Sequence, residues 1–276
     1  MSSDDVWAAG GDEGERLLAI AREAAGQASA YIRTHVPGRL TLKGDRDIAS
    51  ETDTAVERYV QEFLRVRTPK ASFLGEELGS CPNESKLLWI LDPVDGTINL
   101  LHGVPLCAVS LSVARYGVVL AAVIDLPFLG TQYTAVRGAG SFANGRRLQV
   151  SSTAALDAAL VSIDQFTFGE DAARKNPARL RLVEHLALRA QRIRMFGTSA
   201  IDLAWTAEGR LDACIMLGNK QWDTSAGVLL AREAGARVLD HTGSDHTWDS
   251  ASTVVVAPAL EAEFMSVVTN ALGDVI

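Results

Sequence analysis

Two carboxylates, Asp92 and Asp95, stand at the end of an apolar run with only Pro93 and Val94 between them. Acids this close repel each other, and a divalent cation beside them removes that repulsion. A ligand set made only of oxygen suits Mg²⁺, Ca²⁺ or Mn²⁺ better than Zn²⁺. The spacing therefore predicts a site for a hard cation, and an acidic turn that only caps and solvates the chain is the plainer alternative.

The elements that would position these acids can be read on either side of them. The apolar run Leu87–Leu91 has the length and flanks of a buried strand. Because Pro93 has no N–H and favours an extended residue before it, we expect the strand to end at Asp92. Gly96 permits a tight turn, and Thr97 suits the N-cap of a short helix whose first amides can bind an anion.

Three further acids stand at the ends of predicted elements. Glu76 follows a short strand that breaks at Gly75, while Asp53 and Asp223 each lie at the start of a predicted helix. A solvated turn would explain Glu76, and helix capping would explain the two aspartates. Acidic groups that recur at element ends far apart in the chain are harder to attribute to coincidence than any one of them alone.

Residues 92–99, Asp-Pro-Val-Asp-Gly-Thr-Ile-Asn, follow an apolar strand and resemble the signature of the inositol monophosphatase family. Members of that family are Mg²⁺-dependent, lithium-sensitive phosphatases of small phosphomonoesters. The segments that are similar to its other motifs are Lys43, Thr52-Asp53, Gly75-Glu76-Glu77, Gly197-Thr198-Ser199-Ala200 and Trp222-Asp223 with the helix end Glu233-Ala234-Gly235. The resemblance covers the chain from about residue 40 to residue 240.

The resemblance implies a set of site residues. Two or three Mg²⁺ ions would be held by Glu76, Asp92, Asp95, Asp223 and the Val94 carbonyl. Asp53 would hydrogen-bond to Thr97, which would orient or deprotonate the attacking water, so the catalytic candidates are Asp53, Glu76 and Thr97. The predicted substrate-binding residues are Asp95, Gly96, Thr97, Gly197, Thr198, Ser199 and Met216.

Met216 is a departure from the family pattern. In inositol-specific members a glutamate stands at this position, seven residues before the second-signature aspartate, and contacts sugar hydroxyls. A thioether cannot accept those hydrogen bonds as a carboxylate does, and Met216 can instead belong to the core. The leading substrate is inositol 1-phosphate or a related polyol, sugar or cyclitol phosphate. Fructose 1,6-bisphosphate, histidinol phosphate, a 3′-phosphonucleotide, a specialised-metabolite phosphate, or a regulatory binding role on the same fold remain alternatives.

The glycine-rich segment 138–145 invites comparison with a phosphate-binding loop. Gly140 and Gly145 have the spacing of that motif, but Arg146 and Arg147 replace its Lys-Ser/Thr pair. Asn144 and Gly145 form the pair that favours a two-residue hairpin turn. We therefore expect a hairpin here rather than a nucleotide site.

The chain changes character near residue 150. Strand patterns dominate before Ser151–Thr153, and strands alternate with helices after it. We expect an N-terminal α+β subdomain over residues 1–150 with most metal ligands, and a C-terminal α/β subdomain over 151–276 with Asp223 and the substrate-side residues. The resemblance implies that both belong to the layered αβαβα sugar-phosphatase fold, an α/β (α+β) class, and that the protein is a homodimer.

Composition limits the remaining function classes. The chain has 276 residues and a formal net charge of −8, which argues against a nucleic-acid-binding surface. Its N-terminus lacks the pattern of a signal peptide, and no apolar run is long enough to span a bilayer. Three scattered cysteines fit a reducing compartment. We expect a cytoplasmic protein that binds a small phosphomonoester and neither nucleic acid nor membrane.

Overall fold

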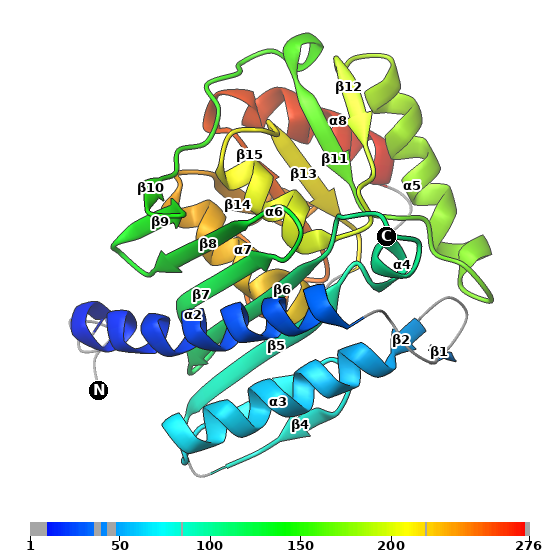
Figure 1. Cartoon of the computed structure of the whole chain (residues 1–276). Coiled ribbons are helices and arrows are strands. Elements are labelled where there is room, and N and C mark those ends of the chain that lie inside the picture. Colours follow the sequence, from blue (N-terminus) through cyan, green and yellow to red (C-terminus); the bar gives the residue numbers. More distant parts are fainter. Residues whose placement is uncertain (1–9, 36–39, 43–47, 84, 219, 274–276) are drawn as a thin grey trace.

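The computed structural model describes residues 10–35, 40–42, 48–83, 85–218 and 220–273. Two large sheets alternate with three layers of helices, which confirms the predicted αβαβα arrangement (Figure 1). The described helices are α2 (Gly10–Thr34), α3 (Glu51–Arg67), α4 (Thr97–Leu101), α5 (Ala172–Ala187), α6 (Ser199–Ala207), α7 (Gln221–Glu233) and α8 (Glu261–Leu272). Two short 3₁₀ turns, at Leu156–Ala158 and Pro258–Leu260, and the small β1–β2 pair (Leu40–Leu42 and Ile48–Ser50) complete the described elements.

The first sheet has eight strands in the order β10-β9-β8-β7-β6-β5-β3-β4. Neighbouring strands are antiparallel except β3 and β5, which are parallel. The strands are β3 (Ser72–Gly75), β4 (Gly79–Cys81), β5 (Leu87–Asp95), β6 (Ala108–Arg115), β7 (Val118–Leu126), β8 (Thr131–Val136), β9 (Gly140–Ala143) and β10 (Arg146–Arg147). The edge strand β4 was not predicted, because its Gly-Ser-Cys sequence carries no β-branched or aromatic residue.

Helices cover both faces of this sheet. In β7, Ala121 and Val123 belong to the core under α2 and α3, whereas Ala122 and Ile124 belong to the core under α6 and α7. Successive strand residues point to opposite faces, so a strand that is buried on both faces is apolar throughout. This explains why β7 appears in the sequence as a continuous apolar run from Val118 to Ile124 without alternation.

The middle layer consists of α6 and α7, which pack closely against each other between the two sheets (Figure 1). A Cβ atom added at Gly227 would lie 2.4 Å from the Cβ of Leu203, so this crossing requires a glycine. The many small residues of these helices, such as Ala200, Ala204 and Ala226, are fully buried. Close packing here fixes the start of α6 relative to the start of α7.

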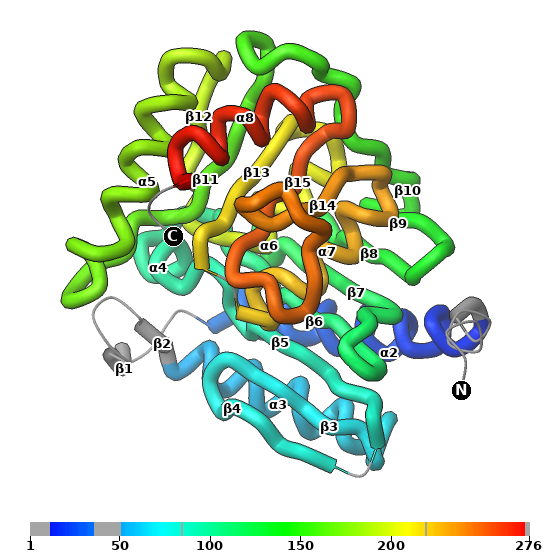
Figure 2. The backbone as a smooth tube through the Cα atoms, turned by 180° about the vertical axis from the view of Figure 1, so that it is seen from behind, coloured from blue at the N-terminus to red at the C-terminus, as the bar shows by residue number. Residues whose placement is uncertain are grey.

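The second sheet has five strands in the order β12-β11-β13-β15-β14. Strand β11 is parallel to both neighbours, while β15 is antiparallel to β13 and β14. The strands are β11 (Leu160–Ile163), β12 (Arg192–Arg194), β13 (Ala213–Met216), β14 (Arg237–Leu239) and β15 (Thr253–Val256). Helices α5 and α8 cover its outer face, as the view from behind shows (Figure 2). Strand β14 was not predicted.

The hairpin predicted from the Asn-Gly pair is confirmed. Strands β9 and β10 pair antiparallel, and Asn144 and Gly145 between them have φ values of 47° and 83°. Both residues are in the left-handed region, as a type I′ turn requires.

The two sheets fall on either side of residue 150, with one ending at Arg147 and the other beginning at Leu160. The division into subdomains stays a prediction, because α6 and α7 pack against both sheets. No helix in the described ranges is long and apolar enough to cross a membrane. The cytoplasmic location also stays a prediction.

Candidate active site

The two acids of the central motif lie on either side of an irregularity in β5. The expected strand end at Asp92 is wrong, because the strand continues to Asp95. Asp92 is opposite Ser110 and Asp95 is opposite Ala108, so β5 carries one extra residue there. A bulge of this kind tolerates the missing N–H of Pro93. The bulge bends the strand between the two carboxylates.

The turn after Asp95 depends on a glycine. Gly96 is the N-cap of α4 with φ 95°, and a Cβ atom there would lie 2.8 Å from the Leu106 carbonyl oxygen. The prediction of Thr97 as the N-cap is therefore wrong, because Thr97 is the first helical residue. Its hydroxyl lies 2.7 Å from Oδ1 of Asp53 and 3.0 Å from the Val94 carbonyl oxygen. The expected hydrogen bond between Thr97 and Asp53 is present.

Helix α3 supplies two buried acids on one face. Asp53 is 1% exposed and lies in the first turn of the helix, where it bonds to Thr97. Glu57, one turn later, is 0% exposed, and its two oxygens accept the backbone N–H groups of Glu77 and Leu78, each at 2.8 Å. The same helix therefore holds the turn after Asp95 and the turn that carries Glu76.

Glu57 was not predicted as a site residue, although the sequence contains a signal for its burial. Glu57 is four residues after Asp53, so both acids lie on one helix face with the apolar Val56 and Val60 nearby. A charged side chain on an apolar face needs partners. Gly75 leaves the space for it, because a Cβ atom there would lie 2.0 Å from Oε1 of Glu57.

Asp95 joins the central motif to α6. Its Oδ2 accepts hydrogen bonds from the Thr198 hydroxyl at 2.6 Å and from the Ala200 backbone N–H. Thr198 is also the N-cap of α6, with its Oγ1 accepting the N–H of Ile201. A carboxylate at a helix N-terminus is stabilised by the free backbone N–H groups and by the helix dipole. The predicted segment Gly197–Ser199 is thus brought next to Asp95.

Asn99 holds the same junction from the other side. Its Nδ2 donates to the carbonyl oxygens of Leu106 and Phe196, at 2.8 and 2.7 Å. Phe196 directly precedes Gly197, which has φ 77° and approaches the Asn99 amide closely. The last residue of the central motif therefore has a structural role, which the sequence analysis did not assign.

Four carboxylates at this junction lie within electrostatic range of one another. The pKa of Asp92 is raised well above its usual value by burial and then by the charges of Glu76, Asp95 and Asp223. The pKa of Asp223 is likewise raised, by burial and by Asp95 and Glu76. Burial also raises the pKa of Asp95, to about 6, and the bonds from Thr198, Ala200 and Ser199 limit that rise. These four side chains cannot all be ionised without a compensating positive charge.

The chemistry of this donor set fits a hard divalent cation. All four side chains are carboxylates, and their mutual repulsion is the condition that a cation relieves. No group of three or more His, Cys, Asp or Glu side chains in the described ranges is already arranged to hold a metal ion. The fit is therefore one of ligand type and proximity.

Met216 lies apart from these groups. It ends β13, is 1% exposed, and belongs to the core formed by α6, α7 and both sheets. The next residue, Leu217, donates its N–H to Oδ2 of Asp164, which pairs with Arg179 at 2.6 Å. The burial favours the packing role over substrate contact. Lys43, which the sequence analysis compared with an early lysine loop, lies outside the described residues.

Comparison with known proteins gives a consistent result. A model described as the inositol monophosphatase family matches residues 13–272. An inositol-1-monophosphatase, ImpA, of Mycolicibacterium smegmatis is 34% identical over 257 residues, which cover 92% of this chain and 92% of the relative. A protein named Nus factor SuhB of Pseudomonas aeruginosa is 38% identical over 205 residues, 73% of this chain and 75% of the relative.

A solved structure has the same architecture. The extragenic suppressor protein SuhB of Bartonella henselae matches with a TM-score of 0.86 and 30% sequence identity. The match covers 92% of this chain and 98% of that protein. The likeness extends over both sheets and all helix layers.

Proposed function

This chain belongs to the inositol monophosphatase family and is a phosphoric monoester hydrolase, and on that premise we propose that it hydrolyses inositol 1-phosphate or a related polyol, sugar or cyclitol phosphate with the help of Mg²⁺. One observation carries the proposal beyond family membership. Burial, and then the charges of acids far apart in the sequence, raise the pKa of Asp92 (Glu76, Asp95 and Asp223) and of Asp223 (Asp95 and Glu76), which puts these carboxylates in one environment.

The ligands of the proposed ions follow the sequence prediction. Glu76, Asp92 and the Val94 carbonyl would hold one ion, while Asp92, Asp95 and Asp223 would hold a second. A weaker third ion would use Glu76 and water. When bound, such ions lower the pKa of a water molecule and stabilise the leaving oxygen of the ester.

The chain's own residues would position the water and the phosphate. Thr97, bonded to the buried Asp53, has a hydroxyl whose orientation is fixed next to the Val94 carbonyl, and it would orient or deprotonate the attacking water. The backbone N–H groups of Gly96 and Thr97, at the start of α4, would bind phosphate oxygens. Gly197, Thr198 and Ser199 would line the same side through their contact with Asp95.

The physiological ester depends on the segment around Met216. A buried methionine supplies no acceptor for vicinal hydroxyls, so the position does not support selection of inositol by a carboxylate. The neighbouring ion pair of Asp164 and Arg179, with side chains 15% and 7% exposed, holds the segment in place. We therefore place related polyol and sugar phosphates beside inositol 1-phosphate as candidates.

A phosphate-release screen tests the proposal. Purified protein is assayed with inositol 1-phosphate, histidinol phosphate, fructose 1,6-bisphosphate and a 3′-phosphonucleotide, with Mg²⁺, with EDTA and with added Li⁺. We expect Mg²⁺-dependent release from at least one polyol or sugar ester and inhibition by Li⁺. A clear preference for the nucleotide would replace the proposed substrate class, and activity in EDTA would contradict the metal requirement.

A binding role is the second candidate. Relatives from Xylella fastidiosa, Pseudomonas aeruginosa and Pasteurella multocida carry the name Nus factor SuhB. A protein with a net charge of −8 has little general attraction for RNA, so a protein partner suits this role better. Absence of phosphate release from every ester, in a protein that still melts cooperatively, would favour this role over catalysis.

We also propose the homodimer that the resemblance implies. Val104 and Phe128, 39% and 42% exposed, line a cavity of about 230 Å³ together with Leu100 and Ile32. Apolar side chains gathered on one surface suit an interface with a second copy. Light scattering after gel filtration would give the mass of the dimer, and a single-chain mass of 29.5 kDa would contradict it.

A further inference from the structure

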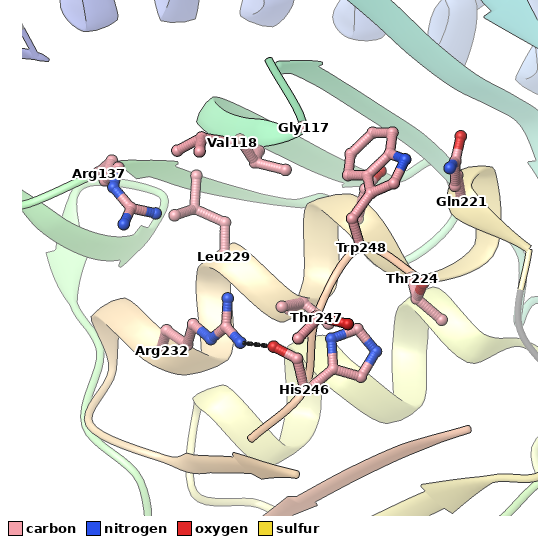
Figure 3. Close-up of a pocket in the computed structure, with 13 residues that line it drawn as sticks. Gly117, Val118, Arg137, Gln221, Thr224, Leu229, Arg232, His246, Thr247 and Trp248 are labelled. Carbon is pink, nitrogen blue, oxygen red and sulfur yellow. Dashed lines mark hydrogen bonds between the residues drawn. The ribbon is translucent and has the colours of Figure 1, made fainter. Parts of the chain in front are cut away.

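A second cavity is lined by α7 and by the segments packed beside it, and none of the four clustered acids lines it (Figure 3). It has a volume of about 220 Å³. Its walls come from the β6–β7 hairpin turn, from α7, from Arg137 after β8, and from the loop 246–248. The segments are distant in the sequence and meet only in the fold.

Two arginines line this cavity. Arg137 follows β8 and Arg232 lies in the last turn of α7, and Figure 3 shows the Arg232 guanidinium bonded to the His246 carbonyl oxygen. Burial, and then the charge of Arg137, lower the pKa of Arg232. Both arginines line the same cavity, so an anion bound there would be attracted by both positive charges.

The nearby acids are turned to other partners. Glu233 accepts the backbone N–H groups of Gly138 and Gly140, at 2.7 and 2.8 Å. Asp245, whose side chain is 81% exposed, pairs with Arg237 at 3.6 Å, although it still acts on Arg232 through its charge. Two arginines therefore line one cavity in a protein whose net charge is −8.

His246 forms part of the wall without adding charge. Burial and the neighbouring Arg232 lower its pKa to about 4, so the ring is neutral near pH 7. Its Nε2 lies 2.9 Å from the Thr253 hydroxyl, and its carbonyl oxygen accepts a bond from Nη2 of Arg232. A guanidinium has five N–H donors, so one such bond leaves donors for an anion.

The rest of the cavity wall combines an aromatic ring and apolar side chains with the polar Gln221, Thr224, Ser225 and Thr247. Trp248 packs over Gly117, where a Cβ atom would lie 3.8 Å from the indole ring. Gly117 and Tyr116 form the hairpin turn, with φ values of 77° and 52°. Val118 and Leu229 continue this apolar wall toward the arginines, as Figure 3 shows.

We propose that this cavity binds a small organic anion that carries an aromatic ring and one phosphate, phosphonate or carboxylate group. The oxyanion would lie between Arg137 and Arg232, because guanidinium groups bind such oxygens in pairs of parallel hydrogen bonds. The ring would cover Trp248, Val118 and Leu229. Binding at this site does not depend on the proposed metal ligands, so it stands or fails separately from the proposed substrate.

Calorimetric titration of the full chain with phenylphosphonate tests the proposal. A phosphomonoesterase does not break the C–P bond of phenylphosphonate. EDTA in the buffer keeps metal ions away from the carboxylate cluster, so the cluster repels the anion and does not bind it. We expect one saturable site. Arg137→Gln and Arg232→Gln should each weaken the affinity by about tenfold or more, as expected for the loss of a charged hydrogen bond.

Arg192→Gln is the matched control, because it removes the same charge from an exposed position on β12. It should change the affinity by less than about twofold. Tryptophan fluorescence gives a second readout: the ligand should change the emission of the parent protein but not that of Trp248→Phe. No saturable binding up to about 10 mM, or equal affinities in the pocket variants and the control, would overturn the proposal.

Discussion

The two ends of α7 carry opposite charges. Near its start, Asp223 of α7 is grouped with Asp92 and Asp95, and burial, followed by the neighbouring carboxylate charges, raises the pKa of Asp92 and Asp223. Near its end, Arg232 of α7 lines the cavity with Arg137, and burial, followed by the charge of Arg137, lowers the pKa of Arg232. In both regions groups of one sign are held together by the fold, and each region thereby suits a ligand of the other sign. The net charge of the chain predicts neither.

The two regions also differ in how their charged groups are held. Asp95 and Asp53 are fixed by short hydrogen bonds from Thr198 and Thr97, and Asp53 is fully buried. Arg232, by contrast, is exposed on one side and has the His246 carbonyl as a partner. Groups that take part in catalysis need a fixed geometry, whereas a binding cavity tolerates more freedom. Changes to the acidic side should therefore have the larger effects.

The largest expected effect is that of Asp95→Asn. Asparagine keeps an acceptor for Thr198 and Ala200 but loses the charge that the proposed ion needs. Phosphate release should fall by about 10³-fold, while the circular dichroism spectrum and the melting curve remain those of a folded protein. Asp157→Asn, at an exposed position, is the control. Retained turnover in Asp95→Asn would contradict the metal assignment.

The next effect is that of Glu57→Gln. One of the two backbone N–H groups that Glu57 binds, those of Glu77 and Leu78, would then face the NH₂ group of the glutamine in place of an oxygen. The turn that carries Glu76 would therefore shift. Activity should fall by about 10–100-fold, and half-maximal activity should require more Mg²⁺. Glu62→Gln, on the exposed face of the same helix, should change neither value. An unchanged Mg²⁺ requirement in Glu57→Gln would show that this residue does not position Glu76.

The smallest effect is on stability, and it should have opposite signs in the two regions. In metal-free protein the pKa of Asp95 is raised by burial from 3.8 to about 6, so the folded state holds the proton more tightly. Its contribution to stability is present below pH 3.8 and is lost as the pH rises through about 6. The pKa of His246 is lowered from 6.5 to about 4, so its contribution is present above 6.5 and is lost as the pH falls through about 4.

Thermal unfolding in EDTA across this pH range measures both contributions. Relative to the parent, Asp95→Asn should gain about 1–3 kcal/mol of unfolding free energy on going from acidic to neutral pH. His246→Gln should show a relative change of similar size in the opposite direction. Two variants whose pH profiles shift in the same direction would remove the contrast between the regions.

Local patterns predicted most of the elements that carry the site. The apolar run before Asp92, the breaks at Gly75 and Gly96, and the helix that contains Asp223 are all present. The bulge in β5 was not predictable, because it depends on how residues 92–95 pair with β6, a separate segment of the chain. Met216 was ambiguous for the same reason. Met216 ends β13, and only its packing against residues of both sheets and of α6 and α7 shows that it is buried.

The sequence by itself determined the family, through the motif at residues 92–99 and the acids at the ends of other elements, and the proposed hard cation follows from their ligand type. It also determined the turns at Gly96 and Asn144–Gly145, which depend on backbone conformations that few residues adopt. The tertiary structure alone decided which groups share an environment. Glu57 reaches the turn after Glu76, and Arg232 lies near Arg137, because packing joins segments whose separation in the chain hides their proximity.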